Sequence, residues 1–162
     1  MRDLPTNQLD PKIKNVWRIN DAIWLTVVFL CCFIPFAIAA VVEPAAWTAV
    51  VLAAIAIAYI VGLVVWLVVL PPIRYVRWRY EVSPEYLDIA RGIVWRKRFV
   101  IPFIRVQNTD TRQGPILRAF GLSSVTVSTA AGEHEIPGLG VEEADRLRDR
   151  AAELARLAQE DV

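Results

Sequence analysis

The sequence predicts a membrane α-hairpin of two transmembrane helices, followed by a small α+β domain. Residues 22–42 carry no charge, and after Glu43 and Pro44 the same is true of residues 45–73. About 20 apolar residues suffice to cross the hydrocarbon core of a bilayer, so each run can span it. Short apolar and polar stretches alternate over much of residues 80–136, which is typical of strands. The alternative for the two runs is an apolar helical pair buried in an oligomer.

These patterns divide the chain into three parts. Residues 1–21 form a polar N-terminal arm on the cytoplasmic side, and residues 22–73 form the hairpin, with spans over about residues 22–42 and 45–70. Residues 74–162 form one small cytoplasmic domain, near the lower end of the usual domain size. The prolines at positions 71 and 72 are expected to end the second helix.

The charges that flank the hairpin predict its orientation. The only charged residue in the turn is Glu43, whereas both outer flanks are basic through Lys12, Lys14, Arg18, Arg74, Arg77 and Arg79. Basic residues close to span ends stay on the cytoplasmic side. The sequence therefore predicts a protein integral to the plasma membrane, with both termini in the cytoplasm and Glu43 outside.

The domain after the hairpin reads as antiparallel strands and a final helix. Two alternating runs, residues 86–90 and 93–101, are expected to pair as a hairpin through a turn at Arg91-Gly92. An amphipathic helix follows over residues 141–159, with acidic residues in its first turn. Between them we expect three further strands and one short helix, over residues 104–110, 124–129, 133–136 and 114–121.

This domain resembles the bacterial pleckstrin-homology-like family, also called the membrane-flanked domain family, in its type with two spans and a single domain. The resemblance covers roughly residues 78–157. It rests on the order and spacing of short stretches at residues 80–82, 89–92, 101–108, 114–122, 128–130 and 136–139. It implies a small, bent antiparallel sheet of about seven strands capped by the C-terminal helix, and no reaction, because fold alone does not fix function.

A basic cluster provides the candidate binding residues. Residues 74–105 contain eight basic and three acidic residues. Basic residues near a membrane are attracted to anionic lipid, although those next to a span also set topology, and charges on a strand can simply protect an edge. The candidate lipid- or partner-binding residues are Arg74, Arg77, Arg79, Trp95, Arg96, Lys97 and Arg98.

Several classes of function find no support in the sequence. The two cysteines, Cys31 and Cys32, lie in a span, and His134 is the single histidine, so no metal site or cofactor is expected. No nucleophile elbow, phosphate loop or dinucleotide motif is present, which indicates a protein that is not an enzyme and has no small-molecule substrate. The near-neutral charge and the acidic final helix argue against nucleic-acid binding.

Two functions from different classes remain. In the first, the hairpin tethers a binding or assembly module at the cytoplasmic membrane face, for a protein partner or anionic lipid headgroups. In the second, the protein is a structural subunit of a membrane complex, assembled through the hairpin as a homo-oligomer or with a protein partner. Small residues in the second span, such as Ala53 and Gly62, favour close helix packing and support the second function.

Overall fold

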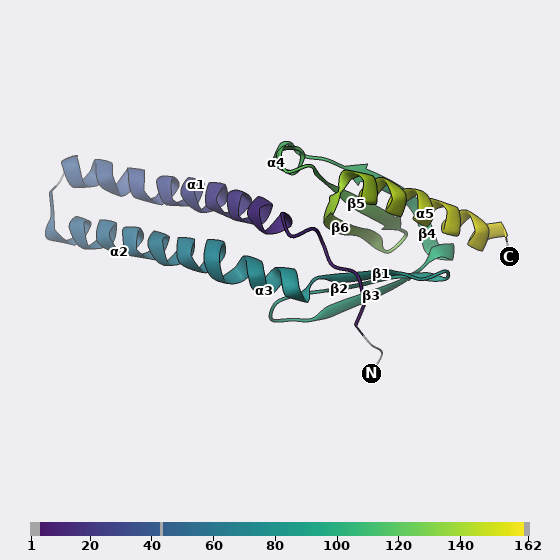
Figure 1. Cartoon of the computed structure of the whole chain (residues 1–162). Helices are drawn as coiled ribbons and strands as arrows, with labels where there is room; N and C mark the ends of the chain where they lie inside the picture. The colour runs from purple at the N-terminus through teal and green to yellow at the C-terminus, as the bar shows by residue number, and fades with distance from the viewer. Residues whose placement is uncertain (1–3, 43, 161–162) are drawn as a thin grey trace. The chain divides into compact units, whose positions relative to one another are not determined.

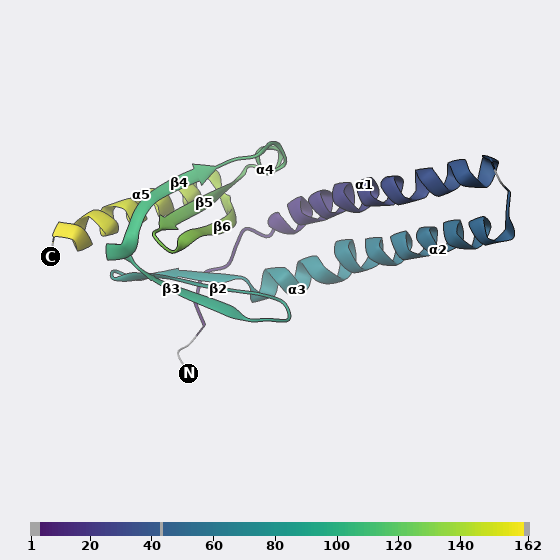
Figure 2. The same ribbon diagram turned by 180° about the vertical axis from the view of Figure 1, so that it is seen from behind.

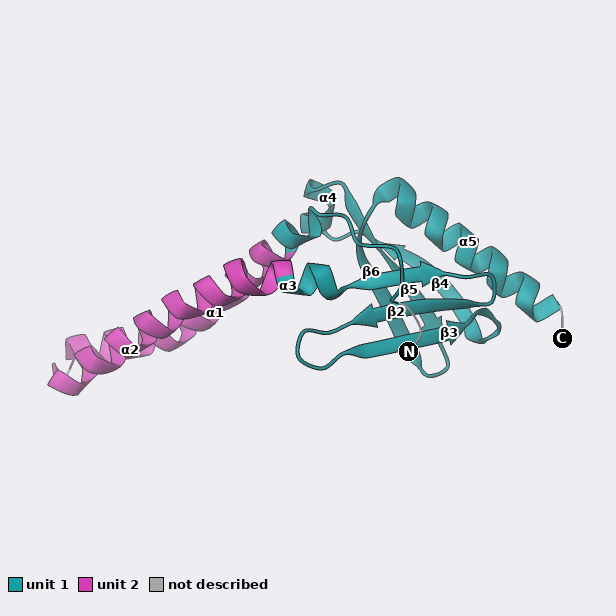
Figure 3. Cartoon of the chain, turned by 60° about the horizontal axis from the view of Figure 1, so that its bottom comes forward, with its two compact units in different colours: residues 1–16, 73–162 teal, residues 17–72 magenta. Residues whose placement is uncertain are grey.

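The computed structural model describes residues 4–42 and 44–160 and divides into two compact units (Figure 1). One unit comprises residues 1–16 and 73–162, and the other comprises residues 17–72, as coloured in Figure 3. We call them the sheet unit and the helical unit and describe each by itself.

The helical unit is an antiparallel pair of helices. Helix α1 (Ile13–Val42) and helix α2 (Ala46–Leu63) run side by side, as seen from both directions in Figures 1 and 2. The segments Ile13–Val42 and Ala46–Arg77 are each long and apolar enough to cross a membrane, with a mean hydropathy of 2.8 in their most apolar windows. Glu43, which the sequence predicts to face outside, lies outside the described residues.

Polar and aromatic contacts join the two helices midway. The hydroxyls of Thr26 and Tyr59 are 3.0 Å apart and share a hydrogen bond. The Tyr59 ring also stacks on Phe29, with ring centroids 4.3 Å apart. Gly62 lies against Leu25, which shows that this small residue serves packing within the hairpin.

The expectation that the prolines at positions 71 and 72 end the second helix is wrong. A π-helical segment, η1 (Val64–Val69), leads into helix α3 (Leu70–Arg77), which contains both prolines. The carbonyl of Leu67 would accept from residue 71 in an α-helix or residue 72 in a π-helix, and proline has no N–H to donate. Instead, the Arg18 Nε donates to this carbonyl at 2.9 Å. The helix continues because another side chain satisfies its open acceptor.

The sheet unit contains six strands in two antiparallel sheets, and not the seven that the resemblance implies. The first sheet has the order β1-β2-β3 and the second β4-β5-β6. The strands are β1 (Arg79–Val82), β2 (Tyr86–Arg91), β3 (Lys97–Pro102), β4 (Val106–Arg112), β5 (Leu122–Thr129) and β6 (Gly132–Gly140). A 3-10 turn, η2 (Phe103–Arg105), connects the sheets, and a short helix, α4 (Pro115–Ala119), joins β4 to β5.

The N-terminal arm adds one β-bridge at the free edge of β1. The backbones of Asn7 and Tyr80 exchange two hydrogen bonds, of 3.0 and 3.1 Å. Leu9 and Ile13 are almost fully buried in the core. Gly138 has a φ of 64°, and a Cβ there would collide with the Ile13 side chain. The arm is therefore packed into the sheet unit, which its polar composition does not indicate.

Strand β5 is buried on both faces. Val127 lies on the face toward the first sheet, since its cross-strand neighbour His134 contacts the Phe99 ring of β3. The opposite face carries Ser124 and Thr126, and helix α5 (Val141–Glu160) covers this sheet with a row of buried alanines (Figure 1). Helix α5 confirms the predicted C-terminal helix.

Candidate functional site

The loop between β2 and β3 differs from the sequence prediction. The second run was expected to be a strand from residue 93, but β3 begins only at Lys97, and residues 92–96 form a loop. Gly92 has a φ of 119°, and a Cβ there would collide with the carbonyl group of Trp95. The chain therefore doubles back tightly at Gly92, a conformation that other residues reach only with strain.

Beside this loop lies a cavity of about 440 Å³, which we call the basic pocket. Six of its lining residues are basic and none is acidic. The lining consists of Leu4, Val76, Arg77, Arg79, Ala90, Arg91, Gly92, Arg96, Lys97 and Arg98. The structure thus brings together five of the seven candidate residues from helix α3, two strands and a loop.

Two of these arginines hold the pocket walls together. The Arg77 Nη1 donates a hydrogen bond to the carbonyl of Ile93, which ties helix α3 to the loop. The guanidinium of Arg79 donates to the Gln8 side chain, once that amide is turned so that its oxygen faces the arginine. Both contacts fix the positions of the segments that carry the charges.

Arg98 is engaged in an ion pair. Its Nε and Nη2 donate to the carboxylate of Asp88, with an Nη2 to Oδ2 distance of 2.6 Å. The Asp88 side chain is 4% exposed and that of Arg98 is 31% exposed. Hydrogen bonding to Asp88 raises the pKa of the Arg98 guanidinium. The charge of Arg98 therefore largely compensates a buried carboxylate.

Arg96 and Lys97 are the available charges. Both are exposed, and within residues 4–42 and 44–160 neither side chain forms a hydrogen bond or an ion pair. Arg91, which was not among the seven candidate residues, joins them from the end of β2 and lies over the Phe99 ring at 5.2 Å. The predicted hairpin placed Arg91 in its turn, whereas the observed register extends β2 to Arg91 and pairs it with Lys97.

The remaining two candidates lie outside the lining. Arg74 is exposed on helix α3 and does not reach the basic pocket. Trp95 occupies the tip of the loop next to Val94, and their side chains are 81% and 82% exposed. A charged pocket and an exposed apolar tip are thus adjacent in sequence and in space.

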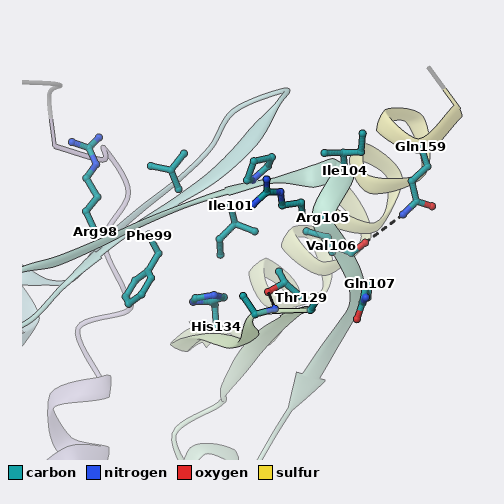
Figure 4. Close-up of a pocket in the computed structure, with 14 residues that line it drawn as sticks. Arg98, Phe99, Ile101, Ile104, Arg105, Val106, Gln107, Thr129, His134 and Gln159 are labelled. Carbon is teal, nitrogen blue, oxygen red and sulfur yellow. Dashed lines mark hydrogen bonds between the residues drawn. The ribbon is translucent and has the colours of Figure 1, made fainter. Parts of the chain in front are cut away.

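A second, wider cavity of about 800 Å³ lies between β3 and the β5–β6 turn (Figure 4). Figure 4 shows Phe99 and His134 facing each other, with ring centroids 4.9 Å apart, and the Gln159 amide donating to the Val106 carbonyl at 3.4 Å. Burial, and then the charge of Arg91, lowers the pKa of His134. Two arginines line the wider cavity: Arg98, which is paired with Asp88, and Arg105. This cavity offers less uncompensated charge than the basic pocket.

The described part of the chain offers no other chemistry that marks a site. No group of three or more His, Cys, Asp or Glu side chains within it could hold a metal ion. Cys31 and Cys32 are free thiols on helix α1. The basic pocket and its loop are therefore the best candidate for a binding site.

Comparison with known proteins gives a consistent picture. A family model described as a bacterial PH domain matches residues 21–155. Over its full length the chain is 39% identical to the UPF0699 transmembrane protein YdbS of Bacillus subtilis, and the alignment covers all of both chains. It is also 29% identical over 91 residues to the UPF0699 transmembrane protein YdbT of the same organism. This alignment covers 54% of this chain and 18% of YdbT. No solved structure matches.

Proposed function

The chain belongs to the bacterial PH domain family, as its resemblance predicted, and from this premise we propose that it presents a PH-like binding module at the cytoplasmic face of the plasma membrane. It is a transmembrane protein with two long apolar helices. In the proposal both termini face the cytoplasm, and the module binds an anionic group of a lipid headgroup or a protein partner. The role is non-enzymatic, and neither the family description nor the names of the relatives indicates an enzyme.

The basic pocket is the observation that carries this proposal. Its lining combines six cations with no carboxylate, and of these cations Arg98 is already paired with Asp88. Arg96 and Lys97 have no partner within the described residues. A concave site with unneutralised positive charge attracts and retains anions.

The energies involved suit a tethered module. Each basic residue near an anionic membrane surface contributes about 1 kcal/mol, and this attraction fades within a Debye length of about 8 Å at physiological salt. A few such contacts give only weak intrinsic affinity. Because the hairpin keeps the module at the membrane, a high effective concentration compensates for this weakness.

Native mass spectrometry of the full chain tests the proposal. The protein is purified in detergent micelles with equal amounts of phosphatidylglycerol and phosphatidylcholine, and the retained lipids are counted. We expect the unaltered chain to prefer phosphatidylglycerol. The double variant Arg96→Glu with Lys97→Glu is expected to lose most of that preference, because the pocket then carries negative charge.

A charge-matched control is available within the same unit. Arg105 and Arg118 are exposed and lie outside the basic pocket, so Arg105→Glu with Arg118→Glu changes the net charge equally. Equal loss in both double variants would reduce the effect to overall charge and remove the pocket as a site. If the pocket variant keeps its lipid preference but loses a protein cross-linked in intact membranes, the anionic group belongs to a protein.

The hairpin supports the second candidate function through a few outward-facing residues. Ala54 and Ala58 lie exposed one turn apart on α2, whereas Gly62 already packs against Leu25 of the same chain. Small residues at such spacing allow close helix approach in a bilayer. Ala54→Leu with Ala58→Leu should disrupt an assembly built on this face. An unchanged oligomer size in detergent would argue against this role.

A further inference from the structure

The tip of the β2–β3 loop exposes two large apolar side chains. Val94 and Trp95 are 82% and 81% exposed, more than any other large hydrophobic residue described in the sheet unit. An aromatic side chain buries roughly 150–250 Å² when it is covered, and burial of apolar area is favourable. The loop thus leaves a large apolar area uncovered within the chain.

The loop holds these side chains in a defined position. The positive φ of Gly92 sets the turn, and the hydrogen bond from Arg77 to the Ile93 carbonyl fixes the loop on helix α3. Ile93 itself is half-buried. Binding through a loop that is already ordered loses little conformational entropy, so its apolar tip can contribute most of its burial energy.

The position of the loop along the chain favours a lipid over a protein as its partner. Arg77 follows Ile73, the last residue of the second apolar run, by four residues of the same helix. At 1.5 Å per residue, this separation is about 6 Å along the helix axis. The headgroup layer on each side of a roughly 30 Å hydrocarbon core is about 5–7 Å thick. The loop is therefore bonded to a residue at headgroup height, and Figure 3 shows it at the α3 end of the first sheet.

The charges beside the tip match a lipid surface. Arg96 and Lys97 directly follow Trp95, and the neighbouring pocket holds no carboxylate. Interfacial membrane-binding segments combine Trp or other large apolar residues with adjacent basic residues. In such segments the aromatic ring lies at the boundary between headgroups and acyl chains, while the cations face the phosphates.

We propose that Val94 and Trp95 insert into the headgroup–acyl boundary of the anionic membrane that anchors the chain, with Arg96 and Lys97 on lipid phosphates. This inference deepens the proposed function and rests on it, since it identifies the anionic partner of the basic pocket as the lipid surface. The sheet unit is then held at the membrane by the loop as well as by the hairpin, which restricts its orientation.

Fluorescence quenching on the full chain tests this insertion. Cys31→Ala and Cys32→Ala remove the native thiols, and Trp95→Cys provides one site for an environment-sensitive probe. The protein is placed in nanodiscs of phosphatidylcholine and phosphatidylglycerol that contain lipid with a quencher high on its acyl chain. We expect a several-fold larger loss of fluorescence at residue 95 than at the exposed control Ala131→Cys, and a smaller loss at residue 95 in nanodiscs without phosphatidylglycerol.

The outcomes separate this inference from the proposed function. Solvent-like fluorescence at residue 95, repeated with Val94→Cys, would overturn the insertion even if Arg96→Glu with Lys97→Glu abolishes the phosphatidylglycerol preference. Quenching at residue 95 together with an unchanged lipid preference in that charge variant would support insertion and remove the pocket as the anion site. Both positions are exposed, so loss of folding is not the expected effect of either cysteine.

Discussion

Three consecutive basic residues of this chain have different physical roles. Arg98 binds the buried carboxylate of Asp88, whereas Arg96 and Lys97 are exposed and have no partner within the described residues. The cause is strand geometry. Arg98 lies opposite Ala90, on the face that also carries Asp88, and Lys97 points to the other face, opposite Arg91. The three basic residues therefore do not form one patch. Arg98 stabilises the fold by pairing with a buried carboxylate, whereas Arg96 and Lys97 remain at the surface, where they are available to other molecules.

The largest effect on stability is expected from removal of Arg98, the charge that is paired with a buried carboxylate. Arg98→Ala leaves the Asp88 carboxylate buried without its cation, which is costly in a poorly solvated site. We expect the midpoint of thermal unfolding of the sheet unit to fall by roughly 5 °C or more, measured by circular dichroism on the full chain in detergent. Arg96→Ala, two residues away, should leave the midpoint unchanged. Similar shifts in the two variants would break the distinction between the two roles.

The loop offers a second way to sharpen the comparison. Gly92→Ala places a Cβ against the Trp95 carbonyl at a φ that L-residues avoid. We expect a loss of roughly 1–2 kcal/mol or more in the free energy of unfolding. Lipid preference in native mass spectrometry should fall as well, although every basic residue is retained. An unaffected lipid preference would show that the shape of the loop is irrelevant to binding.

Added salt should affect the exposed charges and the Asp88–Arg98 pair differently, with a smaller effect than either substitution. Exposed charges are screened beyond a Debye length of about 10 Å at 0.1 M salt, whereas a pair with a buried partner is screened much less. Raising the salt from low to high concentration should therefore weaken the phosphatidylglycerol preference. The difference in unfolding midpoint between Arg98→Ala and the unaltered chain should change little. If both quantities fall together, the Asp88–Arg98 pair behaves as a surface pair.

The sequence was informative where periodicity and charge dominate. Two uncharged runs predicted the two long helices, and alternation predicted the hairpin of β2 with β3 and the position of helix α5. It was misleading at the prolines of α3, since the hydrogen bond from Arg18 to the Leu67 carbonyl joins residues 49 positions apart. It also did not show the burial of Leu9 and Ile13 in the core, and at Ile13 this burial depends on a close fit to the distant residue Gly138.

The candidate site could be predicted in composition but not in detail. The excess of basic residues had singled out five of the ten residues that line the basic pocket. It could not show that Asp88 selects Arg98 as its partner, nor that residues 92–96 leave the strand and place Trp95 at an exposed tip. These features depend on register and on one glycine conformation, which local composition does not determine.

The smallest effect is expected from His134, whose pKa responds both to its own burial and to Arg91 of the basic pocket. Burial and the nearby Arg91 lower the pKa of its imidazole, so the folded state favours the neutral ring. The unfolded chain then takes up a proton at higher pH than the folded chain does. The resulting stability is complete above the ordinary histidine pKa of about 6.5 and is lost as the pH falls toward the folded value.

Acidification from pH 7 to pH 5 should therefore destabilise the unaltered sheet unit more than the His134→Gln variant.

The chain has a single histidine, so one NMR signal reports its titration directly. Arg91→Gln removes one of the two causes and should raise the midpoint of that titration, and anionic lipid bound beside Arg91 should raise it in the same direction by neutralising the guanidinium. A midpoint that responds to Arg91→Gln but not to phosphatidylglycerol would place the lipid away from Arg91. The site would then narrow to Arg96 and Lys97, the charges that have no partner among the described residues.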